Sequence, residues 1–191
     1  MGAAVITAKA CLRSGAGLLT VRACNPEAAI IQMAIPEAMI LHSSRKKFDF
    51  LKYSVLGIGP GLGVSDENMR MMVQIVNGCK QPLVIDADAL NLLSKNSALL
   101  CKLPTDSIIT PHAREFDRLF GAHASEKDRI QTSIQKSKEL SVIIVLKGHK
   151  THVFHQGKIY RNTTGNAGLA KGGSGDALTG IIASFLGQGY P

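Results

Sequence analysis

NAGLAKGGSGDALTGII, residues 166–182, is the stretch that decides most about this sequence. A glycine-dense turn ends in Asp176, and an apolar helix pattern begins directly behind it. Glycine lets the backbone come close to a ligand, and the first turn of a helix has unpaired N–H groups that bind phosphate oxygens. Asp176 is then either a helix cap behind a flexible connection, or a base that takes a proton from a hydroxyl attacking a phosphoryl group.

Length and composition restrict the class of protein. The chain has 191 residues, 45% of them hydrophobic, and a mean hydropathy of +0.11, which is typical of one globular domain with a sizeable core. No apolar run approaches the roughly 20 residues that span a bilayer, and no basic region typical of a signal peptide opens the chain. Four scattered cysteines (Cys11, Cys24, Cys79 and Cys101) argue against a metal site or a disulfide framework and indicate a cytoplasmic protein.

The net charge of +8 raises the question of a polyanionic partner. Nucleic-acid binding would concentrate Lys and Arg beside aromatic side chains. The tight basic run is Arg45-Lys46-Lys47, which is typical of a solvated loop. Attraction of a small polyanionic substrate explains the charge equally well, so we expect neither a nucleic acid nor a membrane partner.

Short apolar strands alternate with helices along the chain, which predicts an α/β protein. We expect a three-layer α/β/α fold with a mainly parallel sheet and no internal domain boundary. Helices are expected over residues 3–12, from Asn25, from Ser65 to about residue 79, and over residues 126–140. Strands are expected at residues 18–22, 38–41, 54–58, 82–85, 107–110 and 142–146, followed by a hairpin at residues 152–155 and 158–160.

Polar motifs follow the strands and should meet at the carboxyl edge of the sheet, where ligands bind in such folds. Residues 59–63 (GPGLG) form either a tight turn or a surface for a flat ring or a ribose. Leu62 breaks the G-x-G-x-x-G pattern, and no P-loop is present, so a Rossmann dehydrogenase or a P-loop kinase is disfavoured. Asp86 and Asp88 are either cap and turn residues or ligands that hold magnesium through water.

Two further motifs have the same ambiguity. His112 and Glu115 lie three apart at a predicted helix start. They are either a cap with a surface histidine or contacts to a ligand and a metal shell. Lys147, with His149 and Lys150, is either an exposed basic hairpin or a segment that surrounds a nucleotide.

Taken together, these motifs resemble the ADP/ATP-dependent NAD(P)H-hydrate dehydratases, members of the ribokinase-like superfamily often labelled carbohydrate kinases. The resemblance covers essentially the whole chain in the same order, and its most specific parts are residues 110–112 (TPH) and 165–176. Further matches are GAGL (15–18), GIGPGLG (57–63), DADALN (86–91), Glu115-Phe116 and LKG (146–148).

The resemblance implies an enzyme, a hydro-lyase that repairs hydrated NADH or NADPH. The ring hydroxyl is phosphorylated with ADP or ATP and then eliminated, with Mg²⁺ accompanying the nucleotide. Asp176 would be the base, and Ala3, Gly61, His112 and Asp176 would contact the hydrated dinucleotide. No direct metal ligand is implied, although Glu115 would reach the metal through water. The implied nucleotide contacts are Lys147, Gly148, His149, Lys150, Thr151, Gly173, Ser174 and Gly175.

The chain departs from the family pattern at Ala113-Arg114, where Pro-Gly is usual, and it opens and closes inside the family domain. We therefore expect one dehydratase domain, residues 1–191, as a core fragment without the family's two ends. A homo-oligomer and fusion to an epimerase domain are further expectations. The alternatives are a ribokinase-like kinase acting on a sugar or a vitamin precursor, and a nucleotide-binding regulatory module without turnover.

Overall fold

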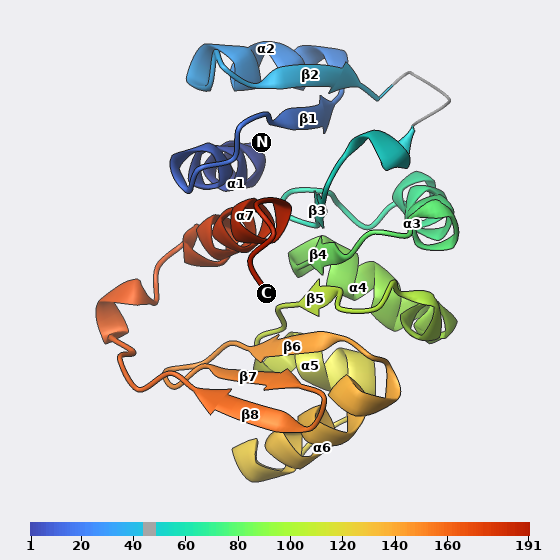
Figure 1. Ribbon diagram of the computed structural model, residues 1–191, viewed down its shortest axis with the longest axis vertical. Helices are drawn as coiled ribbons and strands as arrows, with labels where there is room; N and C mark the ends of the chain where they lie inside the picture. The colour runs from blue at the N-terminus through green and yellow to red at the C-terminus, as the bar shows by residue number, and fades with distance from the viewer. Residues whose placement is uncertain (44–48) are drawn as a thin grey trace.

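The computed structural model describes residues 1–43 and 49–191, and its layers are those of an α/β/α sandwich (Figure 1). The basic run at residues 45–47 therefore lies outside the described residues. Within the described ranges, none of the helices combines the length and the apolar character needed to cross a membrane.

The main sheet has six strands in the order β3-β4-β5-β6-β7-β8. Strands β3 to β6 are parallel, and β7 and β8 form the predicted antiparallel hairpin. Their bounds are β3 Leu56–Ile58, β4 Leu83–Ile85, β5 Ile108–Ile109, β6 Ile143–Leu146, β7 His152–His155 and β8 Lys158–Arg161. Continuous apolar sequences place β4, β5 and β6 in the core, where Leu83, Ile85, Ile109 and Ile144 are fully buried, whereas β8 at the edge of the sheet is exposed.

Helices cover both faces of this sheet (Figure 1). One face carries α7 (Ser174–Gly187), with α1 (Gly2–Arg13) packed against it. The helices of the other face are α3 (Asp66–Gly78), α4 (Ala87–Lys95), α5 (Ala113–Phe120) and α6 (Glu126–Glu139). Short 3₁₀ turns η1 (Phe50–Lys52), η2 (Ser97–Lys102) and η3 (Ala167–Leu169) complete the connections. Ser65 caps α3 as predicted, because its hydroxyl accepts the Asn68 amide at 3.3 Å.

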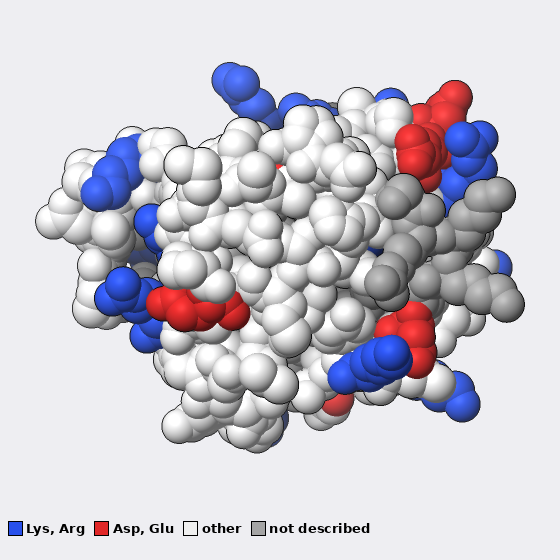
Figure 2. All heavy atoms as spheres, turned by 90° about the horizontal axis from the view of Figure 1, so that it is seen from above, with Lys and Arg blue, Asp and Glu red and all other residues white. Residues whose placement is uncertain are grey.

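A second, two-stranded sheet accompanies the main sheet. Strands β1 (Thr20–Ala23) and β2 (Met39–His42) are parallel to each other, with α2 (Asn25–Ala34) between them in sequence. Among the described residues, neither strand is hydrogen-bonded to β3. The unit has its own small core, made of Ala8, Ala23, Ile31, Ile35 and Ala38. The face shown in Figure 2 is mostly uncharged away from its margins. Met33 of α2 is 87% exposed.

Candidate functional site

Asp86, directly after β4, is the buried acid at the carboxyl edge of the main sheet. Its side chain is 2% exposed, and its Oδ1 lies 2.6 Å from Lys147 Nζ, after β6. The other oxygen, Oδ2, accepts the Thr179 hydroxyl of α7 at 2.8 Å. Asp86 occupies the N-cap position of α4 but makes no side-chain cap bond. Its side chain therefore does not cap the helix and is instead the counter-ion of Lys147, while the interpretation that it holds magnesium through water stays a prediction.

The glycine-rich turn before α7 has the backbone geometry that an anion site requires. Gly173 has a φ of +89°, in the left-handed region that favours glycine. The Ser174 amide is bonded to the Lys171 carbonyl at 3.3 Å. In the described parts of the chain, the amides of Gly172, Gly173 and Gly175 have no protein acceptor. The unpaired amides expected at this turn are thus confirmed.

Asp176 lies in the first turn of α7, half-buried and beside the Asp86–Lys147 pair. Burial raises the pKa of its carboxyl, and the Asp86 charge raises this pKa further, while Lys147 lowers it. A base works best when its pKa approaches the working pH. The environment of Asp176 therefore suits a group that accepts a proton during a reaction and releases it later.

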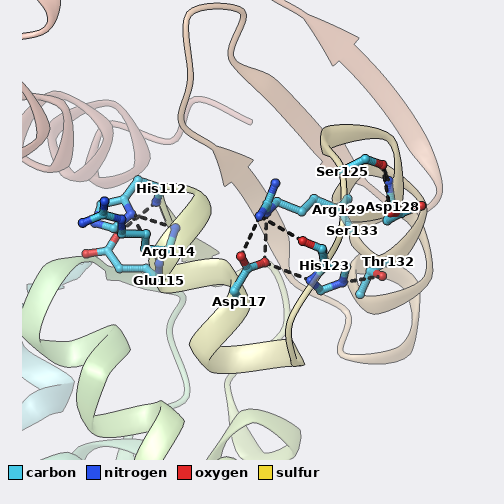
Figure 3. Close-up of polar contacts among 10 residues, drawn as sticks. All are labelled: His112, Arg114, Glu115, Asp117, His123, Ser125, Asp128, Arg129, Thr132 and Ser133. Carbon is cyan, nitrogen blue, oxygen red and sulfur yellow. Dashed lines mark hydrogen bonds and ion pairs between the residues drawn. The ribbon is translucent and has the colours of Figure 1, made fainter.

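His112 and Glu115 form a capping box at the start of α5 (Figure 3). His112 Nδ1 accepts the Arg114 and Glu115 amides at 3.1 and 3.3 Å, and Glu115 Oε2 accepts the His112 amide at 2.8 Å. The cap interpretation is confirmed, but it does not exclude ligand contact. Nδ1 is occupied as an acceptor, so the proton sits on Nε2, and the side chain is 48% exposed.

Glu115 also faces the Asp86–Lys147 pair, because its Oε2 lies 3.8 Å from Lys147 Nζ. An isolated parallel bridge between His112 and Lys147 brings the two segments together. No cluster of three or more potential metal ligands exists among the described residues.

Ala3 and Gly61 come together as the resemblance implied. Gly61 has a φ of +69°, and a Cβ placed on it would lie 3.5 Å from Ala3 Cβ. Asp88 supports this loop, since its Oδ2 accepts the Gly63 amide at 2.8 Å, which confirms its turn interpretation. In the described residues, no hydrogen bond or ion pair joins His112 to this loop.

The segment after β6 lines an open pocket of about 430 Å³. Lys147, Gly148, His149 and Lys150 belong to its wall, whereas Thr151 does not; its hydroxyl bonds the Gly148 carbonyl at 3.3 Å. Five further lining residues were not among the predicted contacts: Ala113, Glu126, Arg129, Leu146 and His152. Glu126 and Arg129 come from α6, and no strand-end or glycine signal marks them.

One wall of this pocket is fixed by a polar network between α5 and α6 (Figure 3). Arg129 Nε and Nη2 donate to the two oxygens of Asp117 at 2.9 and 2.6 Å. His123 Nδ1 lies 2.9 Å from Asp117 Oδ1, and its Nε2 lies 2.9 Å from the Thr132 hydroxyl. The Arg129 guanidinium beside Asp117 lowers the pKa of that carboxyl.

Comparison with known proteins identifies the family of this arrangement. The family model described as NAD(P)H-hydrate dehydratase matches residues 1–191. The chain belongs to the NAD(P)H-hydrate dehydratase family. The ADP-dependent (S)-NAD(P)H-hydrate dehydratase of Enterococcus faecalis is 36% identical, over 100% of this chain and 66% of that protein.

Two further similarities support the family and the fold. The bifunctional NAD(P)H-hydrate repair enzyme Nnr of Moorella thermoacetica is 35% identical, over 98% of this chain and 38% of that protein. The crystal structure of the ADP/ATP-dependent NAD(P)H-hydrate dehydratase of Bacillus subtilis, co-crystallised with ATP/Mg²⁺, matches with a TM-score of 0.81. That match is 31% identical and covers 97% of this chain and 69% of the other. The chain thus spans between 38% and 69% of the length of these family members.

Proposed function

We propose that this chain carries the activity of its family, the ADP- or ATP-dependent dehydration of hydrated NADH or NADPH back to NAD(P)H. The observation that carries the proposal is the position of Asp176, a half-buried acid in the first turn of α7 behind amides without protein acceptors. Such a helix start attracts phosphate oxygens through its amides and its dipole. A carboxylate at this position repels phosphate, so its presence there needs a functional reason. This favours a base over a simple helix cap.

The reaction has two steps. In the first, Asp176 takes the proton of the ring hydroxyl, and the hydroxyl oxygen forms a bond to the terminal phosphorus of the nucleotide. The bond from that phosphorus to the bridging oxygen breaks, so ATP leaves as ADP, or ADP as AMP. In the second, the bond from the ring carbon to the phosphate oxygen breaks and inorganic phosphate leaves with the bonding electrons. A neighbouring ring carbon gives up a proton to the departing phosphate or to water, and the dihydronicotinamide is restored.

The surrounding residues have roles that fit these steps. The open amides of Gly173 and Gly175 stabilise charge on the transferring phosphoryl group, and Ser174 belongs to the same turn. The pocket after β6, lined by Lys147, Gly148, His149 and Lys150, holds the nucleotide, with Thr151 bracing the Gly148 carbonyl. Ala3, Gly61 and His112 contact the hydrated dinucleotide.

Mg²⁺ is proposed to accompany the nucleotide phosphates, because the related Bacillus subtilis enzyme was co-crystallised with ATP/Mg²⁺. No protein cage among the described residues competes for the ion. Glu115, whose Oε2 accepts the His112 amide, is proposed to contact the ion through water.

The remaining proposals concern the context of the domain. Residues 1–191 act as one domain, since α1 packs along α7 and joins the small sheet to the large one. A cytoplasmic location is supported by the four free cysteines. Self-association is supported by the mostly uncharged face shown in Figure 2. Fusion to an epimerase domain is supported by the bifunctional relative.

Replacing Asp176 with Asn tests the function directly. The amide keeps the size of the side chain but is not a base, so turnover should fall by about 10²–10⁴-fold. Nucleotide binding, measured by calorimetry, should persist. The assay follows phosphate release and the return of dihydronicotinamide absorbance together.

Three other results would reject parts of this proposal. A wild-type rate in the Asp176→Asn variant would remove this residue from the mechanism. A stable phosphorylated product would instead indicate the small-molecule kinase of the same fold, which family membership disfavours. Nucleotide binding without turnover in the wild-type chain would indicate the regulatory module.

A further inference from the structure

The ion pair between Asp86 and Lys147 lies beneath the start of α7, and its carboxylate is buried although the Lys147 side chain is 20% exposed. Asp86 is 1% exposed, and both of its oxygens are engaged, one by Lys147 at 2.6 Å and one by the Thr179 hydroxyl at 2.8 Å. Removing two charges from water is costly, and apolar residues of similar size often serve stability equally well. Stability alone therefore does not explain why an acid occupies this position.

The location of the pair relates it to the proposed reaction. A Cβ placed on Gly175 would lie 3.6 Å from Lys147 Nζ and 3.7 Å from Asp86 Oδ2. The pair thus lies against the residue that precedes Asp176 and that belongs to the amide cradle. Thr179 links Asp86 to the first turn of α7, since its hydroxyl also contacts the Gly175 carbonyl at 3.2 Å.

We propose that Asp86 is a positioning residue of the phosphoryl-transfer site. Its carboxylate holds the Lys147 ammonium under the first turn of α7, within reach of a transferring phosphoryl group, and it sets the charge that Asp176 faces. This inference rests on the proposed function, because it assigns Asp86 to the site at which that reaction would take place. Asp86 touches neither substrate in this scheme and acts through Lys147 and Asp176.

Charged groups on two other segments act on the ionisation of Asp176, which makes the inference testable. Asp86 after β4 and Lys147 after β6 face it, and Glu115 of α5 lies behind Lys147, 3.8 Å from the ammonium. From α1, the Thr7 hydroxyl donates to the Asp176 carbonyl at 3.0 Å. The negative charge of Asp86 raises the pKa of Asp176, and the positive charge of Lys147 lowers it.

The two partners should therefore move the ionisation of Asp176 in opposite directions. Asp86→Asn removes a negative charge, so Asp176 should ionise at lower pH and the acid limb of turnover should move to lower pH. Lys147→Met removes a positive charge, so both should move to higher pH. Carboxyl-carbon NMR of aspartate-labelled full chain measures the ionisation without turnover, with Asp176→Asn used to assign the signal.

Measuring turnover together with the melting temperature separates a positioning role of Asp86 from a purely stabilising one. Asp86→Asn should lower kcat/KM by about 10–100-fold, the size found when a supporting partner of a functional group is lost. It should also lower the melting temperature, because Lys147 is left without its closest counter-ion. The double variant, Asp86→Asn with Lys147→Met, should recover the melting temperature but not turnover, since no ammonium remains. Asp106→Asn is the matched control, because this carboxylate pairs with His155 at 3.2 Å, away from the site.

The inference is overturned if Asp86→Asn leaves the Asp176 titration unmoved, or if the double variant turns over like the wild type. Opposite shifts in the two single variants support it, and so does a folded but slow double variant. Because the NMR titration needs no substrate, it decides the matter even if the wild-type chain shows no dehydratase turnover. Failure of the proposed function and failure of this inference are thus distinguishable.

Discussion

Two glycines of the same turn, Gly173 and Gly175, should respond differently to alanine. Gly173 has a φ of +89°, and a Cβ there would lie 2.8 Å from Ile6 Cδ1. A side chain in the left-handed region costs about 1–2 kcal/mol, so Gly173→Ala should lower the free energy of unfolding. Gly175 has no such φ, and its Cβ would face Lys147 Nζ at 3.6 Å. Gly175→Ala should therefore weaken nucleotide binding with little change in melting temperature.

Thermal unfolding and calorimetric titration of ADP and ATP separate the two effects at this scale. Gly172→Ala is a useful reference, since nothing lies within 4 Å of a Cβ placed there. Equal losses of stability in the Gly173 and Gly175 variants would contradict the assignment of one glycine to strain and the other to ligand space.

At the scale of elements, α1 and α7 cross closely enough to make Gly180 indispensable. A Cβ on Gly180 would lie 2.1 Å from the Thr7 carbonyl oxygen and 3.0 Å from the Cys11 amide nitrogen. Gly180→Ala must separate the helices, and overpacking of this kind costs about 1–3 kcal/mol. Thr7 also bonds the Asp176 carbonyl, so turnover should fall with stability.

Urea unfolding of Gly180→Ala against Gly2→Ala measures this prediction. Gly2 lies in α1 with nothing within 4 Å of its Cβ position, so alanine there should be neutral or stabilising by about 0.5–1 kcal/mol. Unchanged stability in Gly180→Ala would show that the two helices adjust freely.

The link between α5 and α6 should be sensitive to pH. Arg129 lowers the pKa of Asp117 below its ordinary value of 3.8, so the pair stabilises the fold above that pH and the effect fades as Asp117 is protonated. Arg129→Met should cost about 1–3 kcal/mol near neutral pH, because a partly buried carboxylate loses its charged donor. Urea unfolding at pH 7 and pH 3 compares the two states. A difference from wild type that stays constant between these pH values would contradict the ion pair as its source.

For the molecule as a whole, sequence patterns predicted the elements well and their non-local contacts poorly. Apolar runs and turn residues marked every strand of the main sheet, usually within two residues, because burial and turn chemistry are local signals. The division into two sheets left no such signal. The Asp86–Lys147 pair joins residues 61 positions apart, and only the order of the strands brings them together.

The same limit applies to the pocket. The segment at residues 147–150 was predicted because it follows an apolar strand, whereas Glu126 and Arg129 enter from a polar helix face that is typical of solvent exposure. Their role in the wall depends on how α6 packs beside β7, which no local pattern records.

A nucleotide should stabilise the whole molecule, because its proposed site includes residues beside α6 and β7 as well as the glycine-rich turn before α7. A ligand that binds only the folded state at about 100 times its Kd contributes about 2.7 kcal/mol. For a chain of this length each kcal/mol raises the melting temperature by about 2–4 °C, so saturating ADP or ATP with Mg²⁺ should raise it by about 5–10 °C. Asp176→Asn should retain this shift, because that carboxylate serves the reaction rather than binding. Lys147→Met and Gly175→Ala should reduce it, and adenosine without phosphates should produce a smaller one. An undiminished shift in both variants would place the nucleotide elsewhere on the surface, and the phosphate cradle before α7 would lose its proposed role.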